Sequence, residues 1–99
     1  MPAYVIVGDR VTDPDMLAAY ARGVGETLRP FGGRLTVGGG AVEVLEGAWL
    51  PERLIILTFP DAAQARAWYA SPAYQAIVAQ RVDATETHFF VIADGVVEP

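Results

Sequence analysis

The sequence has 99 residues, of which 53% are hydrophobic and 19% are charged. This predicts one packed globular domain spanning residues 1–99 and excludes a disordered chain. Cysteine and lysine are both absent, so disulfides, thiolate metal sites, cysteine nucleophiles and lysine Schiff bases are excluded. The net charge of −5 argues against binding to nucleic acid, which requires a basic surface.

The chain shows no targeting or membrane signal. No basic region precedes an apolar stretch at the N-terminus, and the longest purely apolar runs contain only a handful of residues, whereas a spanning helix needs about 20. We therefore expect a cytoplasmic protein with no membrane contact.

The first half of the chain predicts a strand followed by a helix. Residues 3–8 are rich in β-branched and aromatic side chains, which is typical of a strand. Asp13 and Pro14 suit the N-cap and the first position of a helix. Apolar residues then recur at helical spacing as far as Leu28, and Pro30 ends the pattern.

The middle of the chain predicts a β-hairpin. We expect, in order, a strand at residues 34–37 that resumes at 41–45 after three glycines, a turn at 46–52 and a strand at 53–59. Three glycines inside strand-like sequence indicate a bulge or a sharp bend.

The last part of the chain predicts a second helix and a final strand. Asp61 is placed to cap the helix, and Ser71 before Pro72 indicates a break within it. Residues 86–93 form the last expected strand. The resulting order, βαββαβ, is a ferredoxin-like α+β arrangement: a four-stranded antiparallel sheet with two helices on one face.

The expected strands are apolar on both faces. In the third strand, Leu54 and Ile56 oppose Ile55 and Leu57, whereas a sheet covered on one side alternates apolar with polar residues. Two helices can cover only one face, and large exposed apolar patches are rare on soluble monomers. Because residues 46–52 are too few to cover the other face, we expect a homodimer in which two sheets pack face to face.

Two long motifs carry a family resemblance: Leu45-Glu46-Gly47-x-Trp49-x-Pro51-x-Arg53-Leu54 and Ala65-x-x-Trp68-Tyr69-x-Ser71-Pro72-x-Tyr74-Gln75. With Tyr4-Val5-Ile6 and Gly32-Gly33-Arg34, the chain resembles the domain of unknown function 1330 family over roughly residues 3 to 93. That family is similar to the dimeric α+β barrel superfamily. The resemblance implies a homodimer whose two sheets form a barrel, and it implies no established reaction.

His88, the single histidine, is the candidate catalytic residue. It is placed on the last strand, where we expect it to share a face with Phe90 and Ile92. Relatives in the resembled superfamily include haem binders and cofactor-free isomerases and oxygenases. The alternative is a strand-end histidine with ordinary hydrogen bonds, because the sequence identifies no partner that would orient the ring.

Three arginines are candidates for binding an anion: Arg34, Arg53 and Arg81. Arg53 opens an otherwise apolar strand, so its guanidinium could hold a carboxylate in a bidentate manner at the mouth of a pocket. The alternative is a structural ion pair with Glu46 or Glu52 across the hairpin.

Aromatic side chains could line a pocket for a planar ligand. Trp68, Tyr69 and Tyr74 stand at helical spacing, which is also typical of core residues. Trp49, in the expected turn, and Tyr4, on the first strand, join Arg34 and Arg53 as candidate ligand-binding residues.

The function that these features favour is a small homodimer with a pocket for a small anionic or aromatic molecule. It could be an isomerase- or oxygenase-like enzyme that needs no cofactor or metal, with His88 or a carboxylate as the base for proton transfer. The alternative is a non-catalytic dimer that binds a metabolite or supports assembly. A solvent-reachable cavity that holds His88 or paired carboxylates would favour the enzyme.

Overall fold

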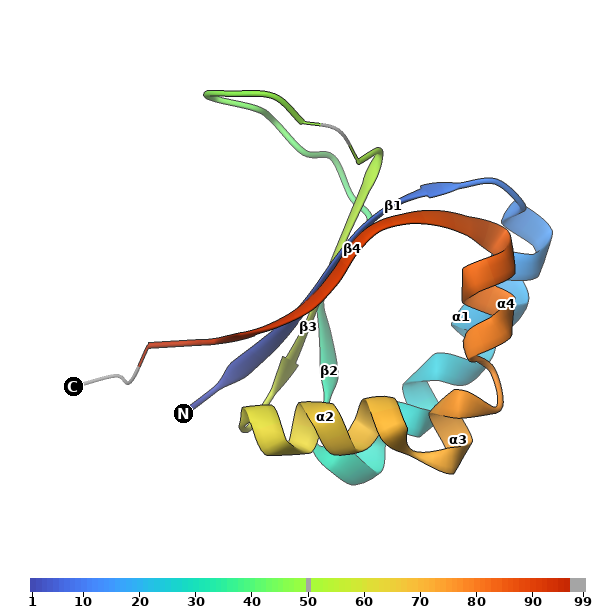
Figure 1. Ribbon diagram of the computed structural model, residues 1–99, viewed down its shortest axis with the longest axis vertical. Coiled ribbons are helices and arrows are strands. Elements are labelled where there is room, and N and C mark those ends of the chain that lie inside the picture. Colours follow the sequence, from blue (N-terminus) through green and yellow to red (C-terminus); the bar gives the residue numbers. More distant parts are fainter. Residues whose placement is uncertain (50, 97–99) are drawn as a thin grey trace.

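A computed structural model describes residues 1–49 and 51–96. The elements in chain order are β1 (Ala3–Val11), α1 (Pro14–Leu28), the 3₁₀ helix η1 (Arg29–Phe31), β2 (Arg34–Gly38), β3 (Arg53–Phe59), α2 (Ala62–Ala70), α3 (Pro72–Gln75), α4 (Val78–Ala84) and β4 (Thr85–Asp94) (Figure 1).

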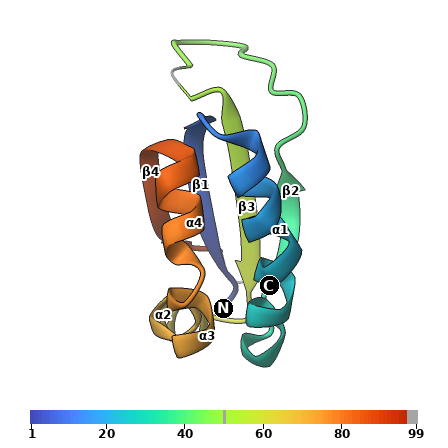
Figure 2. The same cartoon turned by 90° about the vertical axis from the view of Figure 1, so that its right-hand side faces the viewer.

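The four strands form one antiparallel sheet in the order β2-β3-β1-β4. All the helices lie on one face of this sheet, and Figure 2, viewed from the helix side, shows α1 and α4 in front of it. The predicted βαββαβ order and ferredoxin-like α+β fold are confirmed. Among the described residues, no helix is both long and apolar enough to cross a membrane.

Side-chain caps fix where the helices begin. Asp13 accepts a hydrogen bond from the backbone N–H of Met16, 3.1 Å away, and Pro14 occupies the first turn of α1. Ser71 separates α2 from α3, and its hydroxyl accepts the N–H of Tyr74 at 3.2 Å. The break predicted at Ser71 and Pro72 is therefore confirmed.

The core lies between the sheet and the helices. Inward-facing strand residues such as Val5 and Phe59 pack against Trp68 and Tyr74, both fully buried. The Trp68 indole N–H donates to the Thr27 hydroxyl at 3.0 Å, so burial leaves this donor satisfied. Trp68 and Tyr74 are core residues, as one of the two sequence interpretations held, whereas Tyr69 of the same set is 41% exposed and that part of the interpretation is wrong.

The pairing of β1 with β4 contains a bulge. Gly8 pairs with Phe89 and Asp9 pairs with Thr87, which leaves His88 as the extra residue. A Cβ atom on Gly8 would collide with the Phe89 ring, so any larger residue at this position would have to displace that ring. The bulge also interrupts the strict alternation of side chains along β4. Sequence spacing therefore does not determine whether His88 shares a face with Phe90 and Ile92, and that expectation stays a prediction.

One predicted element is wrong: residues 41–45 do not form a strand. We call residues 39–52, apart from Leu50, the projecting segment, because it extends away from the end of the sheet (Figure 1). The backbone N–H of Gly39 donates a hydrogen bond to the Leu54 carbonyl. Gly39 has a φ of +86°, which glycine adopts readily, and beyond this residue the chain leaves the sheet. Residues 46–52 were predicted as a turn, of which Leu50 lies outside the described residues.

The face of the sheet opposite the helices is apolar and open in this chain. The strand register places these large apolar side chains, among others, on this open face: Tyr4, Ile6, Leu54, Ile56, Phe89 and Val91. The first five are half-buried and Val91 is 45% exposed. The sheet is therefore apolar on both faces, as predicted.

Candidate functional site

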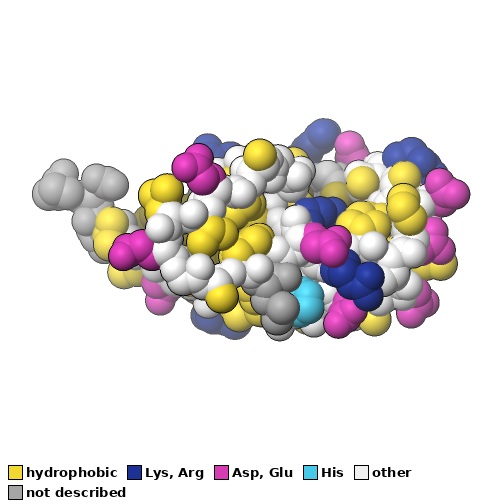
Figure 3. Space-filling model, turned by 90° about the horizontal axis from the view of Figure 1, so that it is seen from above, with side chains coloured by type: hydrophobic (Ala, Val, Ile, Leu, Met, Phe, Trp, Pro, Cys, Tyr) yellow, Lys and Arg dark blue, Asp and Glu magenta, His cyan; other side chains and the backbone are white. Residues whose placement is uncertain are grey.

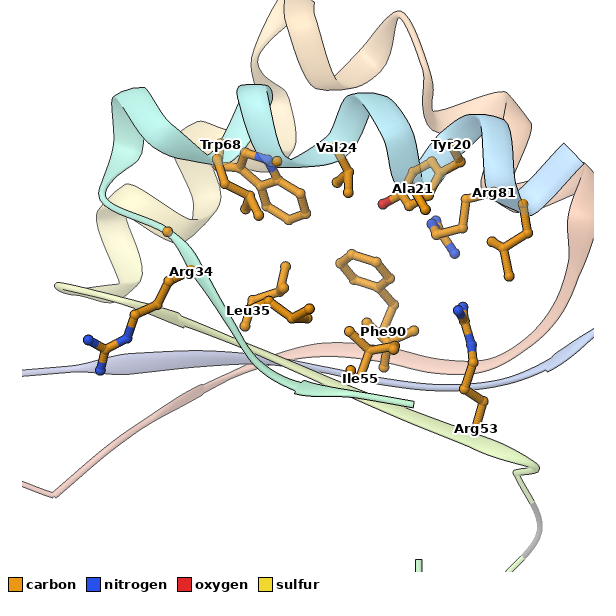
Figure 4. Close-up of a pocket in the computed structure, with 17 residues that line it drawn as sticks. Tyr20, Ala21, Val24, Arg34, Leu35, Arg53, Ile55, Trp68, Arg81 and Phe90 are labelled. Carbon is orange, nitrogen blue, oxygen red and sulfur yellow. The ribbon is translucent and has the colours of Figure 1, made fainter. Parts of the chain in front are cut away.

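A cavity of about 440 Å³ lies between the sheet and the helices (Figure 4). Its walls are mostly apolar, with Leu17 and Val24 from α1 facing Ile55 from β3 and Phe90 from β4. This volume falls within the range of small-molecule sites, roughly 300–1,000 Å³.

Small residues on α1 leave this space unfilled. Leu17, Ala21, Val24 and Leu28 follow helical spacing along the face that turns toward the sheet. Ala21 and Gly25 line the cavity, and a Cβ built on Gly25 would meet no atom within 4 Å. Both residues are exposed, so they lie at the rim where the cavity opens to solvent.

One end of the cavity carries a polar cluster. The hydroxyls of Tyr20 and Tyr74 lie 3.0 Å apart, and Arg81 Nε donates to the Tyr74 hydroxyl at 3.2 Å. Arg81 Nη1 donates to the Thr87 hydroxyl at 3.1 Å, and the guanidinium carbon lies 4.6 Å from the centre of the Phe90 ring. Arg81 is only 5% exposed, so it is a buried cation stacked on an aromatic face.

The same end of the cavity holds a buried ion pair. Arg53 donates from Nε and Nη2 to the two carboxylate oxygens of Asp9, at 2.8 and 2.7 Å. The Asp9 side chain is fully buried, whereas that of Arg53 is 23% exposed. The partner of Arg53 is therefore Asp9, and not Glu46 or Glu52 as the structural alternative expected. The structure thus shows the ion pair that the alternative predicted for Arg53, but with a different acid, which lies 44 residues away in the sequence.

Burial shapes the chemistry of the Tyr20 hydroxyl. Desolvation raises the pKa of Tyr20, and the neighbouring Tyr74 hydroxyl raises this pKa further. Tyr20 is therefore a neutral hydrogen-bonding group at the wall of the cavity at physiological pH.

Arg34, the third arginine predicted to bind an anion, does not direct its charge into the cavity. Arg34 lines the cavity, but Figure 4 shows its guanidinium directed away from the other labelled side chains. Figure 4 also shows Arg53 and Arg81 directing their guanidinium groups toward one another across the cavity.

The remaining predicted residues lie outside the cavity. Trp49 is 37% exposed on the projecting segment, and Tyr4 lies on the open face against Pro2 and Gly95. The structure does not bring these two together with Arg53.

His88 is half-buried at the bulge of β4 and does not line the cavity. The hydrogen bond from Arg10 lowers the pKa of the Glu86 carboxyl, and His88, which lies near Glu86, lowers that pKa slightly further. The described residues contain no cluster of three or more histidine and acidic side chains that could hold a metal ion.

Sequence reasoning missed Asp9 and Tyr20. Asp9 continues the inward alternation of Val5 and Val7, so its place two residues after a core valine is a signal that could have revealed a buried carboxylate. Tyr20 stands on the apolar stripe of α1, where a sequence pattern does not separate a core aromatic ring from one that lines a cavity.

Comparisons with known proteins agree on the fold. The family model described as domain of unknown function (DUF1330) matches residues 2–96. A protein of unknown function from Rhodopseudomonas palustris has a similar structure, with a TM-score of 0.71 and 20% identity; the match covers 98% of this chain and 84% of that chain.

Two further solved structures are similar. A protein from Mycobacterium tuberculosis has a TM-score of 0.57 and 16% identity, covering 99% of this chain and 98% of that chain. An uncharacterised NIPSNAP domain protein from Burkholderia xenovorans has a TM-score of 0.57 and 19% identity; the match covers 97% of this chain and 95% of that chain. The comparison with curated proteins gives no match.

Proposed function

The chain belongs to the DUF1330 family, and we propose that it is a homodimer that binds a small organic molecule in the cavity between its sheet and its helices. The observation that carries this proposal is the cavity itself, with apolar walls and a cluster of polar groups at one end. Such a combination of apolar lining and a few convergent polar groups is typical of ligand sites.

The size of the cavity supports this proposal. The cavity is partly open to solvent, because Ala21 and Gly25, which line it, are exposed. Water can therefore occupy its volume of about 440 Å³ when no ligand is bound. A small organic molecule that displaces this water would bury its apolar body against the walls.

Binding is better supported than catalysis. Tyr20 and Arg81 could donate hydrogen bonds to a carbonyl oxygen and stabilise an enolate, as a cofactor-free proton-transfer enzyme requires. However, His88 does not line the cavity, and the Asp9 carboxylate already accepts two hydrogen bonds from Arg53. For Asp9 to act as the catalytic base, its carboxylate would have to release the hydrogen bonds from Arg53 and then accept a proton from the substrate.

The open face supports the homodimer. Its apolar side chains would be covered by the open face of a second copy, and the projecting segment carries further exposed apolar residues: Val42, Val44, Leu45 and Trp49. Figure 3, viewed onto the end from which this segment projects, shows hydrophobic side chains gathered there, with acidic and basic side chains beside them. A second copy would give both apolar surfaces a partner.

A filled cavity tests the binding function. Gly25→Val and Ala21→Leu place methyl groups into the space without a predicted clash at Gly25, so these variants should fold and lose ligand binding. A panel of small aromatic and alicyclic compounds should raise the melting temperature of the wild type, because a ligand that binds only the folded state stabilises it. Compounds that shift the filled variants as much as the wild type bind elsewhere, and this result would contradict the proposal.

A further inference from the structure

We propose that the polar end of the cavity is a subsite for one carboxylate group, bound by Arg81, so that the ligand is a monocarboxylate with an apolar ring or branched body. This inference rests on the proposed ligand-binding function and adds the chemical class of the ligand. Three features of the cluster support it: the charge of Arg81, the free donors that face the cavity, and the apolar walls beyond them.

The first feature is an unbalanced buried charge. Arg81 is 95% buried, and no described carboxylate lies within 4.0 Å of its guanidinium. Asp9 is balanced by Arg53. The three charged groups at this end therefore sum to one positive charge in a largely apolar environment. Buried charges are normally paired, so the site lacks one negative charge.

The second feature is a set of unused donors. Arg81 donates from Nε to Tyr74 and from Nη1 to Thr87, and its Nη2 has no hydrogen-bond partner among the described residues. One hydrogen on Nη1 and both hydrogens on Nη2 remain, and one from each nitrogen can make an end-on bidentate contact, a geometry in which a guanidinium holds a planar carboxylate. A phosphate dianion would carry more charge than the site lacks.

The Tyr20 hydroxyl adds another donor. Because the Tyr74 hydroxyl accepts a hydrogen bond from Arg81 Nε, its own proton is free to point to the Tyr20 oxygen, which lies 3.0 Å away. This direction leaves the Tyr20 proton without a described acceptor, and Tyr20 lines the cavity. Arg81 thus polarises a chain of two phenols that ends at the ligand.

The third feature is the wall beyond the charge. Val24, Ile55, Leu57, Trp68 and Phe90 surround the remaining volume. These side chains offer no charge to a second ionised group, so they select an apolar body. Figure 4 shows Phe90 between this apolar part and the two guanidinium groups.

Matched pairs of probes test the subsite. We would titrate phenylacetate, 3-phenylpropionate and cyclohexanecarboxylate, each beside its carboxamide, and measure binding by calorimetry and by the shift in melting temperature. Each carboxamide keeps the size and apolar body of its partner and lacks the charge. Loss of one partner of a buried charged contact weakens binding on the order of 30-fold or more, so each carboxylate should bind at least about 30-fold more tightly than its amide.

Substitutions at Arg81 complete the test. Arg81→Met should remove the preference for the carboxylate while amide binding persists, and Arg66→Met, the same change at an exposed arginine of α2, should leave the preference intact. If Arg81→Met fails to fold, Arg81→Lys keeps the charge without the planar fork and should reduce the preference.

The outcomes separate the two proposals. If carboxylates and amides bind equally to the wild type, or if Arg81→Met keeps the full preference, the carboxylate subsite is refuted while the ligand-binding function stands. If no probe of either kind binds, both this inference and the proposed function are contradicted for ligands of this size.

Discussion

The ion pair between Asp9 and Arg53 predicts an unequal response to removal of its two partners. Arg53→Gln leaves the fully buried Asp9 carboxylate without a cation within 4.0 Å, since Arg81 forms no ion pair with it, which should cost about 3–5 kcal/mol. Asp9→Asn leaves two cations, Arg53 and Arg81, at this end of the cavity, but the Arg53 side chain is 23% exposed and can turn to water, so this change should cost about 1.5–3 kcal/mol for the lost charge-assisted hydrogen bonds. The arginine substitution should therefore be the more damaging of the two.

Urea unfolding at one fixed protein concentration measures this difference, with the fluorescence of buried Trp68 as the signal. In a domain of this size each kcal/mol shifts the melting temperature by about 4–8 °C, so Arg53→Gln should lower it by about 12 °C or more. The double variant should be more stable than Arg53→Gln alone, because it removes the stranded charge. If Asp9→Asn proves more damaging than Arg53→Gln, our account of where the desolvation cost resides is wrong.

Three further predictions follow from burial and hydrogen bonding. Ile56→Asp, on the open face, should give a folded monomer by light scattering, whereas Leu57→Asp, in the core, should unfold the chain; a dimeric Ile56→Asp protein would refute sheet-on-sheet packing. Because burial raises the pKa of Tyr20, its contribution to stability is complete below pH 10, the ordinary tyrosine value, and is lost as the pH rises further; Tyr20→Phe should lessen this loss in thermal melts. Thr27→Val deprives the Trp68 indole of its acceptor and should cost about 1–3 kcal/mol in urea unfolding, and an unchanged midpoint would show that this hydrogen bond contributes nothing.

Local signals were sufficient to predict most of the fold. Asp13, Asp61 and Ser71 all cap the helices that the sequence assigned to them, because capping depends on residues only three positions apart. The apolar stripe of α1 and the alternation in β1 and β3 likewise reflect short-range periodicity. These signals fixed the order of elements, and the right-handed rule for crossovers then left one topology.

Residues 41–45 show what strand propensity does not determine. Val42 and Val44 favour extended backbone, but a strand also needs a neighbour to accept and donate its backbone hydrogen bonds. Within one chain the turn at Gly39 carries this segment away from β3, so it has no such neighbour among the described residues.

The candidate site was less predictable because its contacts join distant parts of the chain. Arg53 was identified from its position in an apolar strand, yet its partner Asp9 depends on the register between β1 and β3. Arg81 was identified as a possible anion ligand, but its burial and its lack of an acidic partner emerge only when α4 packs on β4. Charge balance inside a protein is a property of the packed structure and not of the sequence order.

The bulge in β4 connects the sheet to the proposed subsite. In a regular strand, side chains three residues apart point to opposite faces. Thr87 and Phe90 are three residues apart, yet both contact Arg81, one through its hydroxyl and the other through its ring. The extra residue, His88, makes this possible, and Gly8 opposite leaves room for Phe89 on the other face. His88 thus shapes the candidate site through its place in the backbone.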